Sequence, residues 1–543
     1  MAFIRTTHLL LLILVSFASM LFTTSSSQPP EDGNNDATTG DIDWWCDTTP
    51  HPQPCKYFMS HAHDSHHNTS LQRSGFRKIA VDVAMQHALR SYKQILHLRS
   101  DLVNHRQRTV WVDCLKLHDN TLLQLNRTLQ GLPGLNQTCT DFDIQTWLST
   151  ALTNIETCRL GSQDLNVSDS IMMPTSSTNL SQLLSNSLAI NGGLLGSEQP
   201  RTVYEEFPIW VTNHERKLLQ STSLTARANL VVAKDGSGNF RTVQEAINAA
   251  AKRTSMSSRF IIYVKKGFYR ENIEVGFNNN NIMLVGDSMR NTIITSSRSV
   301  GGGFTTYSSA TAGIDGLRFI ARDITFSNTA GPLRGQAVAL RSASDLSVFY
   351  RCAIQGYQDT LFVHSQRQFY SQCYIYGTVD FIFGNAAVVF QNCMIYARRP
   401  LKGQANIITA QGRNDPFQNT GIVIQNSKVL AAPDLLKVVR AFNTYLGRPW
   451  QQYSRTVFLK TYLGSLVSPL GWSSWDGSNY AHSTVYYGEY QNYGPASSTR
   501  YRVRWPGYHV ITSANVASQF TVSSLIAGQS WLPATGIPFT PGL

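Results

Sequence analysis

Residues 368–376 read QFYSQCYIY and residues 388–396 read VVFQNCMIY, one pattern of residue types repeated after 20 positions. In both segments an aromatic residue precedes a cysteine by three positions, and an isoleucine follows the cysteine by two. The same pattern occurs 21 positions earlier, in residues 347–355 (SVFYRCAIQ). A repeat of this length is typical of a solenoid, in which each coil buries its apolar positions against the next coil. These segments therefore predict a parallel β-helix.

The pattern continues at longer intervals in residues 424–429 (IQNSKV) and 458–463 (FLKTYL), each 34 positions after the one before. Loops inserted into coils of constant length explain the longer intervals. From residue 229 onward, short runs of Val, Ile and Phe alternate with Gly, Asn and Asp turns, which is typical of strands. We expect an all-β right-handed parallel β-helix over residues 229–543. A β-sandwich is the alternative, although it would not need this register.

The first part of the chain has a different periodicity. Between Phe76 and Leu160 apolar residues recur at helical spacing, for example in residues 110–129 and 144–160. We expect an all-α four-helix bundle, a pro-domain that spans residues 28–160 and precedes the β-helix. Residues 161–200 are rich in Ser, Asn and Gly, and we expect residues 161–228 to form a linker.

The N-terminus carries an apolar segment from Leu9 to Phe22, preceded by Arg5. The segment is short for a bilayer span and small residues follow it, so residues 1–27 are expected to be a cleaved signal peptide; a signal anchor is the alternative. Secretion permits N-glycosylation, and all five Asn-x-Ser/Thr sites precede residue 180. The expected glycosylation sites are Asn68, Asn126, Asn136, Asn166 and Asn179.

Secretion also permits disulfides, and the chain has eight cysteines. One pair flanks three prolines and can close a short loop, and a second pair can link two helical segments. A third pair would lie on neighbouring coils of the β-helix, within disulfide reach. The predicted disulfides are Cys46–Cys55, Cys114–Cys158 and Cys373–Cys393. Cys352 would lie one coil before Cys373 and compete for it, and Cys139 has no obvious partner.

Positive charge is concentrated in the β-rich region. Residues 221–543 hold 30 Lys and Arg against 14 Asp and Glu, a net charge of +16, whereas the remainder has a net charge of −4. A basic surface suits a polyanion such as an acidic polysaccharide, and secretion argues against nucleic acid. Solubility alone is the alternative explanation.

The segment GTVDFIFGNA, residues 377–386, places Asp380 inside an apolar run, where an unpaired carboxylate is costly. Asp359, in YQDTLF, precedes Asp380 by 21 residues, which is the coil interval. Two carboxylates on neighbouring coils would face the same solvent, and because they do not easily ionise together, one pKa should rise while the other stays low. The pair is predicted to supply an acid and a base or nucleophile. The alternative is that each aspartate caps a turn.

Four neighbours support a chemical role for the pair. Gln358 precedes Asp359, and Gln336 lies one coil earlier in RGQAVAL. Neutral amides suit an oxyanion that forms during acyl transfer, although amide ladders also stabilise stacked coils. Arg448 and Trp450, in YLGRPW, would supply a cation for a carboxylate and a flat surface for a sugar ring. Core packing is the alternative for Trp450.

Other reaction classes lack their motifs. The repeat region has no cluster of His, Cys and carboxylates at zinc spacing, and no Gly-x-Ser-x-Gly elbow of a serine esterase. The glycines of residues 236–238 (GSG) lack the Lys-Ser/Thr ending of a phosphate-binding loop and are expected to form a turn.

Four separate motifs, GTVDFIFGNA, YQDTL, GQAVAL and YLGRPW, closely resemble the conserved segments of plant pectin methylesterases, in the same order. The resemblance covers residues 229–543. The first region resembles the pectin methylesterase inhibitor-like pro-domain of the longer family members, in its Cys46/Cys55 loop, DCLKL and TWLSTALTNIETC. Residues 216–219 (RKLL) stand where that family is processed.

The resemblance implies hydrolysis of methyl esters of homogalacturonan (pectin) in the cell wall, without a metal or an organic cofactor. It implies that Asp380 is the nucleophile, that Asp359 is the proton donor and then the base, and that Gln358 stabilises the oxyanion. The implied substrate-binding residues are Thr306, Gln336, Arg448 and Trp450. The implied partners are pectin, the chain's own pro-domain, a subtilisin-like processing protease that acts at Arg216, Lys217, Leu218 and Leu219, and separate inhibitor proteins.

Two other functions fit a secreted β-helix. A polygalacturonase or pectate lyase would cut the polysaccharide chain itself, but a glycosidase needs two carboxylates around a glycosidic bond and a calcium-dependent lyase needs more clustered acids. A binding role is the third possibility, with the helical region as an inhibitor of another enzyme. Removal of residues 28–219 should raise activity only if the chain is an esterase held by its own pro-domain.

Overall fold

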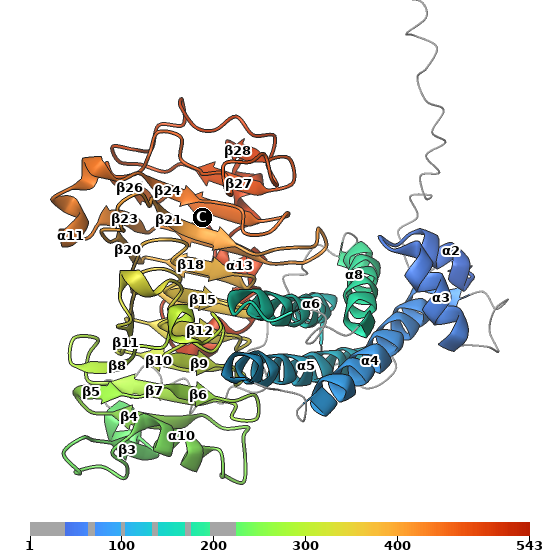
Figure 1. Ribbon diagram of the computed structural model, residues 1–543, viewed down its shortest axis with the longest axis horizontal. Coiled ribbons are helices and arrows are strands. Elements are labelled where there is room, and N and C mark those ends of the chain that lie inside the picture. Colours follow the sequence, from blue (N-terminus) through green and yellow to red (C-terminus); the bar gives the residue numbers. More distant parts are fainter. Residues whose placement is uncertain (1–38, 63–70, 99–103, 133–138, 169–174, 196–223) are drawn as a thin grey trace, which may run out of the picture. The chain divides into compact units, whose positions relative to one another are not determined.

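The computed structural model describes residues 39–62, 71–98, 104–132, 139–168, 175–195 and 224–543 (Figure 1). The predicted signal peptide, the predicted processing site and the sequons at Asn68 and Asn136 lie outside these residues. Of the other sequon asparagines, Asn126 and Asn166 are exposed and Asn179 is half-buried. Within the described ranges, none of the helices combines the length and the apolarity that crossing a bilayer requires.

The helical region is built on four long helices whose apolar sides share one core. Phe76, Leu125, Leu148 and Leu184, one from each of these helices, belong to this core and are fully buried. The helices are α2 (Ile42–Asp47), α3 (Pro52–Ala62), α4 (Arg73–His97), α5 (His105–Gly131), α6 (Asp141–Asp164) and α8 (Thr175–Leu195), and the strands β1 (Thr39–Gly40) and β2 (Leu71–Gln72) pair antiparallel. The predicted four-helix bundle is confirmed.

The fourth helix of this bundle, α8, lies within the predicted linker, and α6 extends into it as far as Asp164, so that prediction is wrong for residues 161–164 and 175–195. Eight of the 21 residues of α8 are Ser or Asn, which have modest helix propensity because their side chains compete for backbone hydrogen bonds. Leu180, Leu184 and Leu188 recur every four residues and are fully buried. Burial of this stripe in the bundle stabilises a helix that propensity alone does not favour.

Capping boxes begin two of the long helices, and two disulfides link helices of this region. Asn104 and Gln107 form a capping box at the start of α5, and Thr140 and Asp143 form another at the start of α6. The predicted disulfides Cys46–Cys55 and Cys114–Cys158 are both present, and the second joins α5 to α6.

Three parallel sheets form the β-helix, with strands that stack coil upon coil (Figure 1). The first sheet contains β3 (Leu230–Val232), β4 (Phe260–Val264), β7 (Ile282–Gly286), β10 (Ile320–Arg322), β13 (Ser347–Tyr350), β16 (Arg367–Ser371), β19 (Ala387–Gln391), β22 (Gly421–Gln425), β25 (Arg455–Leu459), β27 (Tyr486–Tyr490) and β28 (Tyr508–Val510). The second contains β5 (Gly267–Arg270), β8 (Thr292–Ser296), β11 (Thr325–Asn328), β14 (Ala353–Gln355), β17 (Tyr374–Gly377), β20 (Met394–Ala397), β23 (Lys428–Ala431) and β26 (Tyr462–Leu463). The third contains β6 (Ile273–Val275), β9 (Ala312–Ile314), β12 (Leu340–Ser342), β15 (Leu361–Val363), β18 (Ile382–Gly384), β21 (Asn406–Gln411) and β24 (Thr444–Gly447).

The strand register confirms the repeat that predicted the fold. Phe349, Tyr370, Phe390, Ile424 and Phe458 follow one another across five neighbouring strands of the first sheet. Their side chains are fully buried in the interior of the β-helix, and the three consecutive aromatic rings are stacked with centroids 4.6 Å apart. The sequence repeat therefore arises from side chains that stack on one another in the core.

The predicted Cys373–Cys393 disulfide is wrong: both residues carry free thiols, as does Cys352, and all three are fully buried. The Cys373 thiol is 3.2 Å from the backbone oxygen of Phe349, and the Cys393 thiol is 3.5 Å from that of Tyr370. Each thiol therefore fills a core position and contacts a carbonyl of the preceding coil, as a small apolar residue with a weak donor can do. Cys139 is also free and half-buried.

Short helices complete the β-helix region. Val522 and Leu525 of α13 and the nearby Trp531 pack on the outward side chains of the first sheet, including Phe369 and Val389. The short elements are α10 (Val243–Ala250), α11 (Pro433–Leu436), α12 (Ala514–Ser518), α13 (Val522–Leu525), η2 (Leu224–Arg227), η3 (Val300–Gly302), η4 (Pro332–Arg334), η5 (Val439–Ala441), η6 (Gly528–Ser530) and η7 (Leu532–Thr535).

Candidate active site

The two predicted carboxylates stand at equivalent points of neighbouring coils. Asp359 precedes β15 and Asp380 precedes β18, and these strands pair with Leu361 opposite Ile382. Both aspartates have left-handed backbone φ angles, 58° and 50°, which Asp tolerates better than most residues. The Asp359 N–H donates to the carbonyl of Val379 at 3.0 Å, which ties the two turns together. One backbone geometry, repeated one coil later, therefore aims both carboxylates the same way.

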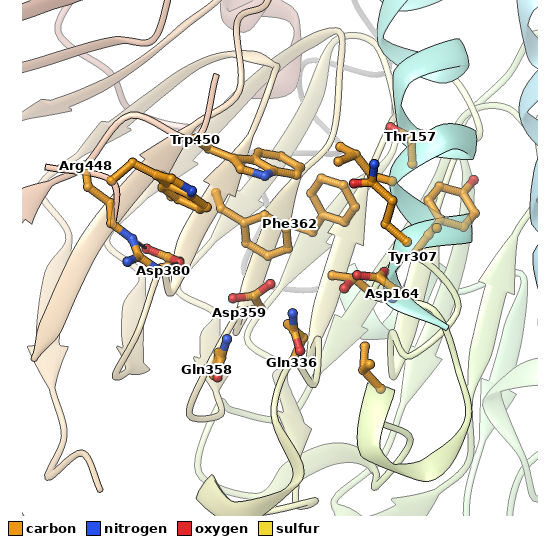
Figure 2. Close-up of a pocket in the computed structure, with 18 residues that line it drawn as sticks. Thr157, Asp164, Tyr307, Gln336, Gln358, Asp359, Phe362, Asp380, Arg448 and Trp450 are labelled. Atoms are coloured by element: carbon orange, nitrogen blue, oxygen red, sulfur yellow. Dashed lines mark hydrogen bonds and ion pairs between the residues drawn. The ribbon is translucent and has the colours of Figure 1, made fainter. Parts of the chain in front are cut away.

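A cavity of about 430 Å³ lies beside this pair (Figure 2). The seven residues predicted to bind or transform the substrate all line it: Thr306, Gln336, Gln358, Asp359, Asp380, Arg448 and Trp450. Asp359 and Asp380 are each only 7% exposed. The structure thus brings together residues that span more than 140 positions of the sequence.

Arg448 is the cation that faces Asp380 (Figure 2). Its Nε donates to Asp380 Oδ1 at 2.8 Å and its Nη2 donates to Oδ2 at 2.5 Å, a two-bond ion pair. The Arg448 backbone N–H donates to the carbonyl of Thr409 at 3.0 Å, which anchors the residue at the end of β24. A bidentate pair of this kind fixes the orientation of the carboxylate as well as its charge.

The surroundings shift the pKa values of the two carboxyl groups to different extents. Burial, followed by the charges of Asp380 and Asp164, raises the pKa of Asp359 well above its usual range. Burial also raises the pKa of Asp380, but the hydrogen bonds and charge of Arg448 oppose that rise. Asp359 is therefore the member that keeps its proton, and Asp380 the member that ionises first.

The two predicted amides stand on neighbouring coils on the other side of the pair. The carbonyl of Gln336 accepts from the Val300 N–H at 2.9 Å, and the carbonyl of Gln358 accepts from the Ala337 N–H at 3.2 Å. Their side chains lie beside Asp359 (Figure 2). This position is compatible with donation of hydrogen bonds to an oxygen of a bound ester.

An aromatic wall forms the opposite part of the cavity. Phe362 and Phe383 are stacked with centroids 4.3 Å apart, and Trp450 meets both rings edge to face, at 6.3 and 5.7 Å. Gly412 makes room for Trp450, because a Cβ on that residue would lie 2.7 Å from the indole Cε3. Such a wall is apolar and flat, as contact with a sugar ring or a methyl group requires.

Sequence reasoning missed several lining residues. Phe362 and Phe383 are 21 positions apart, like the two aspartates, and the coil interval could have identified them. Trp475 carries no periodic signal, yet its ring centroid is 4.3 Å from Cζ of Arg448.

The helical region also contributes to this cavity, through Thr157, Leu160 and Asp164 of α6. The Asp164 carboxylate accepts a hydrogen bond from the backbone N–H of Thr306 at 2.8 Å. The Thr157 hydroxyl is 2.9 Å from Nε2 of the buried His364. These contacts join segments far apart in the chain, and no pattern in the sequence indicates them.

Comparison with known proteins identifies the family. A family model described as pectinesterase matches residues 229–529, and a second, described as plant invertase/pectin methylesterase inhibitor, matches residues 40–190. The chain belongs to the pectinesterase family. Its probable pectinesterase/pectinesterase inhibitor 33 relative from Arabidopsis thaliana is 60% identical over 93% of this chain and 87% of that protein. Pectinesterase 2 of Citrus sinensis is 54% identical over 93% of this chain and 95% of its own length.

A solved pectinesterase has the same β-helix. The structure of pectin methylesterase from carrot is 57% identical and matches with a TM-score of 0.57, over 58% of this chain and 98% of the carrot chain. Residues 229–543 make up the same share of this chain. The chain is thus an enzyme of the pectinesterase family with an N-terminal inhibitor-like domain.

Proposed function

We propose that this chain hydrolyses the methyl esters of homogalacturonan and releases methanol and acidic pectin. The observation that carries the proposal is the buried pair Asp359 and Asp380, of which only Asp380 is held by a cation. A pair divided in this way supplies a proton donor and an ionised nucleophile at one pH. The net positive charge of residues 221–543 supports an acidic polysaccharide as the substrate.

In the first step an oxygen of the Asp380 carboxylate forms a bond to the ester carbonyl carbon. The carbonyl oxygen becomes an oxyanion, for which Gln358 and Gln336 are placed as donors. When the C–OCH₃ bond breaks, the leaving oxygen takes the proton of Asp359 and departs as methanol. The galacturonate acyl group is then bound to Asp380 as an anhydride.

In the second step water attacks the same carbonyl carbon. Asp359, now ionised, takes a proton from that water, and the bond from the acyl carbon to Asp380 breaks. The products are a galacturonic acid unit, ionised Asp380 and protonated Asp359. We assign Arg448 to orient Asp380, Trp450 to contact a sugar ring and Thr306 to contact the substrate at the cavity edge.

Substitution of Asp380 tests this proposal. Asp380→Asn should lower methanol release from methylated pectin by on the order of 1,000-fold or more, because the amide is a poor nucleophile. The circular dichroism spectrum should be unchanged, which shows that the fold is retained. Asp434→Asn is the matched control, since Asp434 is a partly exposed carboxylate on α11 outside the cavity. Retained methanol release in Asp380→Asn would contradict the mechanism. If the parent chain lowers the viscosity of the pectin solution without releasing methanol, an enzyme that cleaves the polysaccharide chain would be favoured.

We further infer that the helical region inhibits the enzyme from within the same chain. Asp164 is hydrogen-bonded to Thr306, and Thr157 and Leu160 line the cavity that contains the two carboxylates. Their presence supports exclusion of the polysaccharide from the cleft while the helices are attached.

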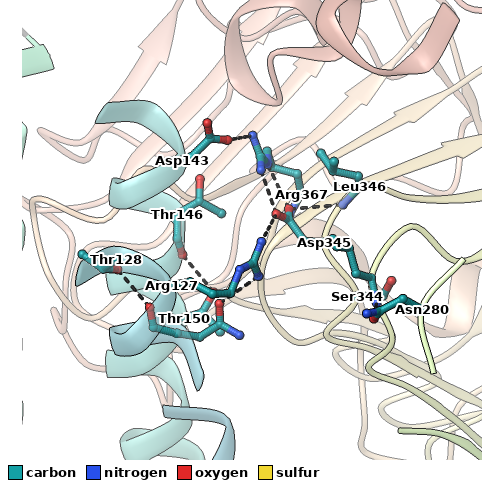
Figure 3. A network of polar contacts seen from close by, with 12 residues as sticks. Arg127, Thr128, Asp143, Thr146, Thr150, Asn280, Ser344, Asp345, Leu346 and Arg367 are labelled. Carbon is teal, nitrogen blue, oxygen red and sulfur yellow. Dashed lines mark hydrogen bonds and ion pairs between the residues drawn. The ribbon is translucent and has the colours of Figure 1, made fainter. Parts of the chain in front are cut away.

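Ion pairs outside the cavity support a stable contact (Figure 3). Arg367 of β16 bonds Asp143 of α6 at 2.6 Å and Asp345 at 2.7 Å, and Arg127 of α5 is 3.9 Å from Asp345. Lys116 of α5 is 2.8 Å from the buried carboxylate of Asp315. Buried charges held by partners on the other side of a contact are costly to separate.

The matching experiment compares methanol release by the full chain with release by residues 224–543. We expect the shorter chain to be more active, and Asp143→Ala in the full chain to relieve part of the inhibition by leaving Arg367 without one partner. Asp43→Ala is the control, because Asp43 is exposed on α2. Equal activity of the long and short chains would contradict inhibition and leave a folding role for the helical region.

We also propose secretion to the cell wall, with removal of residues 1–27 and cleavage at Arg216–Leu219 by a subtilisin-like protease. The apolar N-terminal segment and the basic pair before two leucines support this proposal. Mass spectrometry of the protein secreted by plant cells would locate both new N-termini. An intact N-terminus on the secreted protein would contradict it.

A further inference from the structure

Arg448 makes two different contacts with its planar guanidinium group. One edge of the group forms the two-bond ion pair with Asp380. Its Cζ atom lies over the ring of Trp475, 4.3 Å from the ring centroid. The side chain of Arg448 keeps 24% exposure, so it is not held by burial alone. An aromatic face beneath a guanidinium is attractive and also fixes the plane of the group.

The two tryptophans of the cavity are used differently. Trp450 rests edge-on against Phe362 and Phe383, at 6.3 and 5.7 Å, and so belongs to the aromatic wall. Trp475 contacts the cation that holds the nucleophile. The second tryptophan is therefore placed to act on Asp380 through Arg448.

Trp475 is itself held by a tight turn. The backbone N–H and the hydroxyl of Ser478 donate to the Trp475 carbonyl at 3.1 and 3.2 Å. Asp476 and Gly477 between them have left-handed φ angles of 48° and 78°. Three residues earlier, Trp472 is fully buried and stacked on Tyr487 at 4.1 Å. The indole is thus carried on a short turn anchored in the core.

We propose that Trp475 is a positioning residue for the esterase reaction, which holds the guanidinium of Arg448 in the plane that keeps Asp380 ionised and aimed at the ester. The role rests on the proposed function of Asp380 as nucleophile. Loss of the indole removes a contact that holds Arg448, weakens the ion pair and lets the carboxylate rotate. The alternative role for Trp475, stacking on a sugar ring, would change substrate binding without changing the carboxylate.

The test compares Trp475→Leu with Trp475→Phe in residues 224–543, since the carrot relative was solved as a chain of that extent. Leu removes the aromatic face, and we expect kcat to fall on the order of tenfold, as a cation–π contact of ordinary strength implies. The acidic limb of the pH profile of kcat/KM should move to higher pH, because Asp380 is then harder to ionise. Phe keeps a weaker face and should give a smaller change of the same sign.

Tyr480→Leu is the control. Tyr480 lies on the same loop, is 38% exposed and does not line the cavity, so its kinetics should match the parent chain. A rise in KM alone in Trp475→Leu, with kcat and the acidic limb unchanged, would overturn the proposal in favour of sugar stacking. Equal effects of Leu and Phe would also overturn it. If Trp475→Leu does not fold, Trp475→Phe decides, and an unchanged kcat and limb would count against the role.

Asp380→Asn, assayed in parallel, distinguishes failure of the positioning role of Trp475 from failure of the proposed role of Asp380 as nucleophile. If Asp380→Asn remains active, the proposed nucleophile is wrong and the role of Trp475 falls with it. If Asp380→Asn is inactive while Trp475→Leu keeps its kcat and pH profile, only the positioning role is wrong.

Discussion

At the scale of single residues, the site depends on the different surroundings of two identical side chains. Asp359 and Asp380 share the same backbone conformation and the same 7% exposure. What differs is Arg448, which bonds both oxygens of Asp380. One cation is therefore enough to make two aspartates on a regular repeat differ in how readily they ionise.

Arg448→Lys should move the acidic limb of the kcat/KM profile to higher pH. The hydrogen bonds and charge of Arg448 oppose the rise that burial causes in the pKa of Asp380, and an ammonium group cannot make both bonds. The ionised fraction of Asp380 then falls at low pH, and kcat should drop on the order of tenfold. Arg448→Ala should have a larger effect of the same sign. Arg399→Lys, an exposed site, is the control, and a limb that stays in place in Arg448→Lys would contradict this role.

At the scale of elements, the coil is the unit that carries both stability and the site. Phe390 on β19 is fully buried and stacked on Tyr370 of β16 at 4.6 Å. The same coils place Asp359 and Asp380 in their turns. A defect in the stack should therefore destabilise the region that holds the carboxylates.

Phe390→Ala should lower the free energy of unfolding by about 3–5 kcal/mol, because a large ring leaves a cavity between coils that cannot collapse. Denaturant titration measures the loss. Phe268→Ala on β5 is the matched control, since its ring is 67% exposed, and it should change stability by less than about 0.5 kcal/mol. Equal losses in the two variants would show that the aromatic stack does not stabilise the coils.

Gly412→Ala should weaken substrate binding without removing a catalytic group. Its Cβ would lie 2.7 Å from Cε3 of Trp450, so the indole must move off the aromatic wall. We expect KM to rise on the order of 2- to 10-fold with little change in kcat, the size of one aromatic contact. Gly276→Ala, where an added Cβ has nothing within 4 Å, should behave like the parent chain. An unchanged KM in Gly412→Ala would contradict the role of Trp450 in substrate binding.

At the scale of the whole molecule, the contact between helices and β-helix places ionisable groups in dry surroundings. Asp113 of α5 is buried and its carboxylate accepts a hydrogen bond from the Thr305 hydroxyl. Burial raises the pKa of Asp113 to about 6, despite this bond and the nearby charges of Lys116 and Arg341. The contact therefore favours the protonated carboxyl.

This shift predicts how stability depends on pH. Below its ordinary pKa, Asp113 is protonated in both the folded and the unfolded chain and does not lower the free energy of unfolding. Above about pH 6 it must be ionised while buried, which lowers the free energy of unfolding. Asp113→Asn should therefore raise the free energy of unfolding of the full chain at pH 7.5, by at most about 3 kcal/mol, with little gain at pH 4. Asp119→Asn, exposed on the same helix, is the control. A gain that is independent of pH would contradict ionisation of Asp113 as the cause.

Most of the β-helix could be predicted because its core is a linear repeat. Phe349, Tyr370 and Phe390, about 20 residues apart, lie opposite one another on neighbouring strands. Asp359 and Asp380, 21 residues apart, likewise lie on neighbouring coils. The helix α8 was not predicted because its Ser and Asn residues do not favour a helix, and its row of leucines is stabilised only by packing in the bundle. The free state of Cys373 and Cys393 was also hidden, since spacing gives proximity but not the direction of a thiol.

The sequence by itself determined the β-helix, the two disulfides of the helical region and the seven residues around the cleft, because each depends on a repeat, a local pattern or a recognisable motif. Only the tertiary structure decided that Trp475 lies under Arg448 and that Asp164 of α6 meets Thr306. These contacts join segments that share no repeat and no local interaction. Their formation depends on which surfaces fit together once each part has folded, and this information is not carried by any single stretch of sequence.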